Sequence, residues 1–181
     1  MPQQNFPKLV YLAEDDQDDR DLFLEAIRAL RPEIAVEVFA DGQELLDNLS
    51  QAREDTPEII FMDINMPRKN GFETVREIRE GAGNSDGVRI IMLSTSKSIL
   101  HIEMCYRLEA DFYAVKPDTF EELQSLLAEI LELDWSTAVR SRKEFFLFGY
   151  MEKMKEQAAS DPQKQNFLLS IDSWIKQMRF S

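Results

Sequence analysis

The chain has 181 residues, 44% of them hydrophobic and 30% charged, which is enough for one buried core and a modest extension. Its net charge of −13 argues against a protein that binds nucleic acid by neutralising phosphates. A single cysteine, the lack of a signal-peptide pattern, and the lack of any apolar stretch near the roughly 20 residues that span a bilayer predict a cytoplasmic protein with no membrane segment.

Short apolar runs alternate with amphipathic segments along the first three quarters of the chain. In chain order we expect strand 9–13, helix 18–30, strand 34–39, helix 44–53, strand 58–62, helix 71–80, strand 89–93, helix 97–109, strand 112–115 and helix 119–133. Pro32 closes the first helix, and Thr119 opens the last one with a capping-box pattern. Five strand–helix units whose strands are apolar on both faces predict a doubly wound parallel α/β sheet.

Residues 134–181 form a compositionally separate extension. They hold eight Lys or Arg and six Asp or Glu, a net charge of +2, whereas the preceding residues carry −15. Helices are predicted over Arg142–Ala159 and Pro162–Arg179, with Asp161 as N-cap of the second. This second helix has an apolar stripe made of Phe167, Leu168, Ile171, Trp174, Ile175 and Met178. The stripe must be covered, so we expect it to cap the domain, form a dimer or dock a partner.

Polar residues follow four of the predicted strands. They are Glu14, Asp15 and Asp16 after the first strand, Asp63 after the third, Ser94 and Thr95 after the fourth, and Lys116 after the fifth. Because the carboxyl ends of parallel strands meet at one edge of a sheet, these side chains should share a crevice. Three carboxylates repel one another unless a cation is present, and Mg²⁺ prefers hard oxygen ligands. The sequence therefore predicts a Mg²⁺ site that also handles a phosphoryl group.

The same residues, in this order, strongly resemble the receiver domain of two-component response regulators. The motifs are Glu14-Asp15, Asp63-x-x-Met66-Pro67, Asn70-Gly71, Ser94 and Lys116-Pro117. The resemblance covers residues 7–133, leaves 134–181 as a helical C-terminal extension, and is closest to stand-alone receivers of the chemotaxis and phytochrome-partner type, which lack a DNA-binding output domain. It implies a flavodoxin-like five-stranded sheet with the strand order 2-1-3-4-5.

The resemblance also implies a separate role for each acidic residue. Asp63 would be the phosphoacceptor, taking a phosphoryl group from a sensor histidine kinase or a phosphotransfer protein, and would also contact the metal. Asp15 would be a direct Mg²⁺ ligand, Glu14 would act largely through metal-bound water, and the backbone carbonyl of Asn65 would complete the protein's ligands.

Three further residues would respond to the phosphoryl group. Lys116 would pair with its oxygens, Ser94 would move toward it, and Tyr113 would change rotamer. The outcome would be a reshaped protein-binding face made by the fourth helix, fifth strand and fifth helix. That face, or the C-terminal helices, could also form a homodimer.

Two assignments stay open in the sequence. Which two of Glu14, Asp15 and Asp16 bind metal depends on where the first strand ends, and we place the pair at Glu14-Asp15 because Ala13 best ends that strand. Either Ser94 or Thr95 could be the switch hydroxyl. Glu109 stands where the family usually has glycine, which leaves the local turn conformation open.

The leading interpretation is a phosphorylation-dependent binding module rather than an enzyme. An alternative is a Mg²⁺-dependent phosphohydrolase with an aspartyl-phosphate intermediate, but such enzymes carry a second acid two residues after the nucleophile, where this chain has Asn65. A third possibility is a receiver-shaped scaffold that no longer accepts phosphate. The sequence names neither the cognate kinase nor the downstream protein target.

Overall fold

Five parallel strands form one sheet in the order β2-β1-β3-β4-β5, as predicted. The strands are β1 Leu9–Ala13, β2 Ala35–Phe39, β3 Ile59–Met62, β4 Arg89–Ser94 and β5 Phe112–Val115. The helices are α1 Gln17–Leu30, α2 Gly42–Leu49, α3 Gly71–Arg79, α4 Ile99–Arg107, α5 Phe120–Leu131 and α7 Pro162–Lys176. The computed structural model describes residues 6–51, 55–81, 87–135 and 161–176, together with residues 145, 155 and 158.

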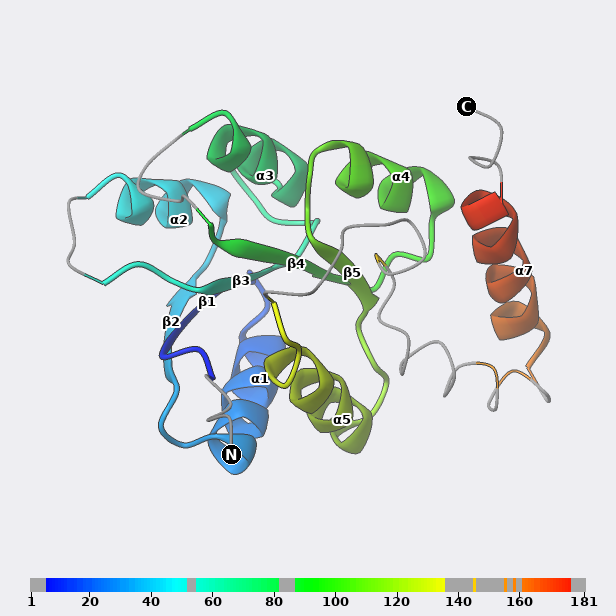
Figure 1. The fold of residues 1–181 in the computed structure, drawn as a ribbon, viewed down its shortest axis with the longest axis horizontal. Helices are drawn as coiled ribbons and strands as arrows, with labels where there is room; N and C mark the ends of the chain where they lie inside the picture. Colours follow the sequence, from blue (N-terminus) through cyan, green and yellow to red (C-terminus); the bar gives the residue numbers. More distant parts are fainter. Residues whose placement is uncertain are drawn as a thin grey trace.

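Helices cover both faces of the sheet, with α2, α3 and α4 on one side and α1 and α5 on the other (Figure 1). Successive side chains of a strand point to opposite faces. In β3, Ile60 and Met62 therefore pack into the core beneath α2–α4, while Ile59 and Phe61 pack into the core beneath α1 and α5. Burial on both sides explains why β1, β3, β4 and β5 contain continuous apolar runs, whereas the edge strand β2 is only partly buried and carries Glu37.

Two helices end earlier in the structure than the sequence predicted. The helix expected around 44–53 ends at Leu49. The amide of Ser50 donates to the carbonyl of Leu46, and the amide of Gln51 donates to the carbonyl of Asn48 at 3.1 Å, which tightens the last turn. The helix expected over 97–109 is the shorter α4. It ends in a Schellman motif, in which the amides of Glu109 and Ala110 donate back to the carbonyls of Tyr106 and Cys105.

Two helix starts were predicted closely, because their caps are local. The Thr119 hydroxyl accepts a hydrogen bond from the amide of Glu122, and α5 begins directly after it. The Asp161 carboxylate accepts from the amide of Gln163 at 2.9 Å, and α7 begins at Pro162.

The apolar stripe of α7 packs against the receiver-like part of the same chain, beside α4 at the β5 edge of the sheet (Figure 1). Of the three coverings expected for this stripe, the structure therefore shows the intramolecular one. Met178 and most of the helix predicted over Arg142–Ala159 lie outside the described residues.

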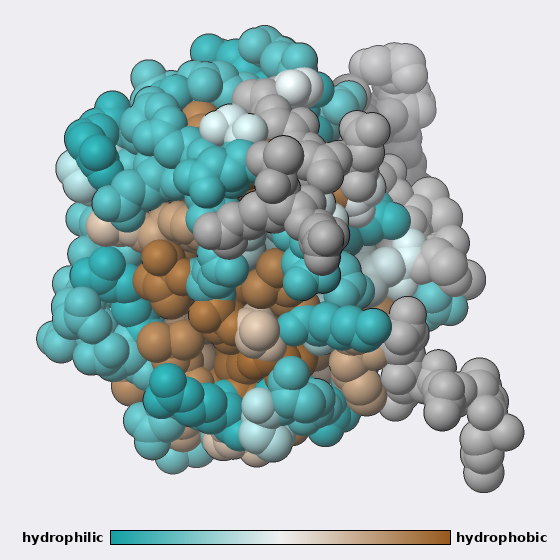
Figure 2. Space-filling model, turned by 90° about the vertical axis from the view of Figure 1, so that its left-hand side faces the viewer, coloured by the Kyte–Doolittle hydropathy of each residue, from teal (hydrophilic) through white to brown (hydrophobic). Residues whose placement is uncertain are grey.

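The opposite edge of the sheet, formed by β2, is different in character. Figure 2 looks at this side and shows apolar side chains gathered in the middle of the face between hydrophilic margins. Val36 and Val38 of β2 are half-buried there. Within the described ranges, no helix combines the length and the apolar character that a membrane crossing requires.

Candidate functional site

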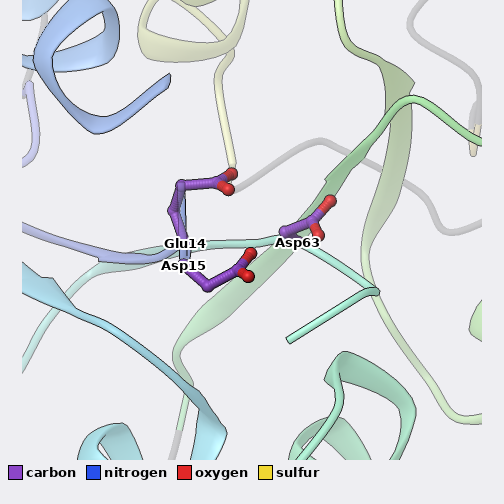
Figure 3. A group of neighbouring side chains, drawn as sticks. All are labelled: Glu14, Asp15 and Asp63. Atoms are coloured by element: carbon purple, nitrogen blue, oxygen red, sulfur yellow. The ribbon is translucent and has the colours of Figure 1, made fainter. Parts of the chain in front are cut away.

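Three carboxylates meet at the carboxyl ends of two neighbouring strands. Glu14 and Asp15 follow β1, and Asp63 follows β3, whose last residue pairs with the last residue of β1. One oxygen from each carboxylate lies within 4.8 Å of the others. Figure 3 shows the three side chains extending to the same side of the strand ends. Glu14 and Asp63 are buried while Asp15 is exposed, so the group is open to solvent on one side.

The third acid of the run has a different task. The Asp16 carboxylate caps α1 by accepting a hydrogen bond from the amide of Asp19 at 3.0 Å. Asp16 is therefore engaged at the helix terminus, and the geometry favours Glu14 and Asp15 as the pair that faces Asp63.

Lys116, the first residue after β5, brings the positive charge to this group. Its Nζ donates to Glu14 at 2.6 Å and to Asp19 at 2.7 Å, and it lies 3.6 Å from an oxygen of Asp63. The sequence interpretation missed Asp19. An acid in the first turn of a helix that follows an acidic run was the available signal, but its reach to β5 depends on how α1 packs.

Burial and pairing shape the titration of these groups. Burial raises the pKa of Asp63 and of Glu14 above their usual values, and the neighbouring Lys116 opposes that rise in both. For Lys116 itself burial would lower the pKa, but hydrogen bonds to Asp19 and Glu14 and the charge of Asp63 raise it instead. Lys116 therefore stays protonated beside Glu14 and Asp63, whose ionised forms are disfavoured by burial.

The backbone around Asp63 fixes the direction of its side chain. The amide of Asn65 donates to a carboxylate oxygen of Asp63 at 2.8 Å. A Cβ at Gly71 would lie 2.3 Å from the carbonyl of Asp63, so a larger residue there would push on the site. Asn70 anchors the start of α3 with a reciprocal capping box to Glu73. The assignment of the Asn65 carbonyl as a metal ligand stays a prediction.

Ser94 and Thr95 differ sharply in their surroundings. Ser94 is the last residue of β4 and is fully buried, whereas Thr95 is exposed. The oxygen of the Ser94 hydroxyl accepts from the amide of Ser96 at 3.3 Å. Tyr113, on the neighbouring strand β5, is also fully buried, and its hydroxyl donates to the carbonyl of Ser96 at 2.7 Å. Ser94 and Tyr113 thus meet at the same turn.

His101 of α4 lies beside this turn. It is partly buried, its Nδ1 lies 2.8 Å from the Ser96 hydroxyl, and its ring packs edge-on against Phe72 at 5.4 Å. It therefore supports the same turn from the α4 side. Cys105 is buried, and burial raises the pKa of its thiol.

The donor set fits a hard divalent cation. It offers carboxylate oxygens alone, two of them on buried residues and one at the surface, with no sulfur or imidazole among the clustered ligands. Mg²⁺ prefers such oxygens and keeps several waters, which an open side of the site allows. Lys116 neutralises part of the carboxylate charge in the same place.

Comparison with known proteins agrees with this geometry. A profile of the response regulator receiver domain matches residues 10–128. The response regulator Rcp1 of Synechocystis sp. is 28% identical over 134 residues, covering 71% of this chain and 89% of Rcp1. The probable methanogenesis regulatory protein FilR2 of Methanothrix harundinacea is 26% identical over 135 residues, covering 72% of this chain and 86% of FilR2.

Solved structures show the same fold. The phosphorylated cyanobacterial phytochrome response regulator RcpA superposes with a TM-score of 0.65 at 29% identity, covering 73% of this chain and 96% of RcpA. The Mn²⁺-bound form of Rcp1 gives 0.61 at 27% identity, covering 74% of this chain and 97% of Rcp1. The match spans nearly the whole of RcpA and of Rcp1, whereas about a quarter of this chain lies outside it.

Proposed function

Because this chain belongs to the response regulator receiver domain family of two-component systems, we propose that Asp63 accepts a phosphoryl group from a phosphohistidine donor. A carboxylate oxygen of Asp63 forms a bond to phosphorus while the bond from phosphorus to the donor imidazole breaks. The departing nitrogen keeps the electron pair and takes up a proton from solvent. The observation that carries this proposal is the meeting of Glu14, Asp15, Asp63 and Lys116 at one end of the sheet.

Each residue of the site has a role in this transfer. Bound Mg²⁺ would supply positive charge that offsets the charge on the phosphoryl oxygens. Asp15, Asp63 and the carbonyl of Asn65 would ligate it directly, and Glu14 largely through water. Lys116 is close enough to Asp63 to pair with a phosphoryl oxygen on it.

Ser94 and Tyr113 would carry the change away from the site. A phosphoryl group adds charge and strong acceptor oxygens, which favour donation from a nearby hydroxyl. The buried position of Ser94 at the end of β4 supports it over the exposed Thr95 as that hydroxyl. Tyr113 would respond because its hydrogen-bond partner, Ser96, also binds Ser94.

At the level of the whole chain we propose a receiver domain over residues 7–133 and a helical extension over 134–181. The partners would be a sensor histidine kinase or phosphotransfer protein and a downstream protein target, with no nucleic acid. The acidic net charge of −13 supports protein rather than DNA as the target. A single cysteine supports a location in the cytoplasm.

The test is a phosphotransfer profile of the chain against the sensor kinases of its host, each loaded with labelled phosphate. We expect rapid transfer from one kinase, dependent on Mg²⁺ and absent in Asp63→Asn. Label that still transfers to the Asp63→Asn protein would contradict the assignment of the acceptor. The same assay separates a receiver from a phosphohydrolase, since a hydrolase would release inorganic phosphate in many turnovers instead of holding the label.

A further inference from the structure

The C-terminal segment forms a cap on the surface made by α4 and β5. We define the C-terminal cap as Phe145 together with the apolar face of α7, namely Phe167, Ile171 and Trp174. All four side chains are buried, and they share one hydrophobic cluster with the sheet. In Figure 1, α7 stands outside β5 and next to α4.

The contacts between the cap and α4 are specific in geometry. The indole Nε1 of Trp174 donates to the Glu103 carboxylate at 2.5 Å. The rings of Trp174 and Phe145 meet the ring of Tyr106 edge-on, at 5.7 and 5.2 Å. Such pairs add to the burial of area and define one docked position.

The cap also attaches to the edge strand of the sheet. The backbone amide of Tyr113 in β5 donates to the carbonyl of Phe145 at 2.8 Å, and their rings lie 6.5 Å apart. An edge strand presents backbone groups that another chain could pair with. Here the chain's own Phe145 occupies that position at Tyr113.

Tyr113 is therefore shared between the cap and the acidic site. On the cap side it holds Phe145 through its backbone amide, and on the site side its hydroxyl donates to Ser96, whose amide donates to the Ser94 hydroxyl. All three linking hydrogen bonds are short or moderate in length, and Ser94 and Tyr113 are fully buried. Because this region is closely packed, a movement of the Ser94 side chain should also move Tyr113.

We propose that the C-terminal cap is a built-in occupant of the α4–β5 surface and that phosphorylation of Asp63 loosens it, which uncovers this surface for a partner protein. The proposal rests on the function assigned to Asp63 above. Charge added at Asp63 draws the Ser94 hydroxyl toward it, which alters the hydrogen bonds of Ser96 and the seat of Tyr113. Tyr113 holds Phe145 through its backbone amide and its ring. A shift of Tyr113 therefore weakens the binding of the cap. Coupling of this kind is reciprocal.

The first test follows Trp174 in the full chain. Trp135→Phe removes the second tryptophan and keeps an aromatic ring in its place, against Phe112. After treatment with acetyl phosphate and Mg²⁺, we expect Trp174 emission to shift to longer wavelength and its acrylamide quenching constant to rise about twofold, since local opening exposes the indole. The Asp63→Asn version of the same protein should show neither change.

Gel mobility in Phos-tag, run on the same samples, keeps the two proposals apart. Retarded mobility with a Trp174 signal that does not change would overturn the coupling and leave the function of Asp63 intact. Mobility that never changes would overturn the proposed function itself, and the coupling with it.

A second test uses a matched pair on α7. Ile171 is fully buried in the cap, whereas Leu169 is 67% exposed on the same helix. Ile171→Asp should detach the cap and tighten the binding of beryllium trifluoride with Mg²⁺, a phosphoryl analogue, by about fivefold or more. Leu169→Asp, with the same added charge, should bind it as the parent does. Equal affinities for all three proteins would contradict the coupling, even if Ile171→Asp folds less stably.

Discussion

At the scale of single residues, Lys116 is the cation on which the charge balance of the site depends. It holds Glu14 and Asp19 at hydrogen-bond distance and faces Asp63. With Lys116→Met, we expect the free energy of unfolding to fall by about 2 kcal/mol without Mg²⁺, because largely buried carboxylates lose their counter-charge. Added Mg²⁺ should restore part of the loss.

Urea unfolding with and without Mg²⁺ measures this effect. Lys97→Met is the matched control, since Lys97 is exposed and should change stability little. If the two variants unfold at the same urea concentration without Mg²⁺, Lys116 does not offset the carboxylates as described.

The acidic run offers a second residue-scale prediction. Asp15 faces Asp63, whereas Asp16 caps α1. Asp15→Asn should weaken Mg²⁺ or Mn²⁺ binding by at least about tenfold, because a charged oxygen ligand is lost. Asp16→Asn removes the same charge one position later and should leave affinity nearly unchanged, since asparagine caps a helix as well as aspartate does. Calorimetric titration of both proteins measures the affinities, and the reverse order of effects would make Asp16, not Asp15, the direct metal ligand.

At the scale of elements, the end of α4 is held by a residue ill-suited to its backbone. Glu109 has φ of +66°, in the left-handed region that favours glycine, and closes the Schellman motif. Glu109→Gly should therefore raise the free energy of unfolding by about 0.5–1 kcal/mol. Glu109→Ala has a Cβ like the parent and should give no such gain. Equal stabilities for the two variants would mean that the turn carries no strain.

The sequence predicted the strands from their short apolar runs, four of which are followed at once by polar residues, whereas the strand order came from the resemblance to receiver domains. It predicted helix starts at Thr119 and Asp161, where the cap is local. The ends of α2 and α4 were missed because backbone hydrogen bonds of Gln51 and Ala110 close their last turns, and apolar periodicity does not report such bonds. The reach of Asp19 to Lys116 was missed for a related reason, since it depends on how α1 packs beside β5.

At the scale of the whole molecule, the two edges of the sheet are treated differently. The β5 edge is covered at Tyr113 by the chain's own extension, whereas apolar side chains of the β2 side show at the surface (Figure 2). On α4, Leu100 and Met104 remain 78% and 45% exposed beside the docked α7. Covering the α7 stripe within one chain removes the main reason to dimerise through it.

Light scattering tests this consequence. The full chain should have the mass of one chain at micromolar concentration, because its apolar stripe is already buried. Residues 1–135 alone should associate more readily, because the surface around Tyr106 and the β5 edge is then exposed. A dimeric mass for the full chain, lost in the shorter one, would show that the extension pairs two chains instead.

The measurement that bears most directly on the account is intact-mass spectrometry of the full chain after incubation with acetyl phosphate, followed by peptide mapping. We expect one added phosphoryl group in the presence of Mg²⁺, located on Asp63, and none after chelation or in Asp63→Asn. A phosphoryl group mapped to another residue, or a chain that takes up none although Mg²⁺ binds, would contradict the assignment of this acidic site as a phosphoacceptor.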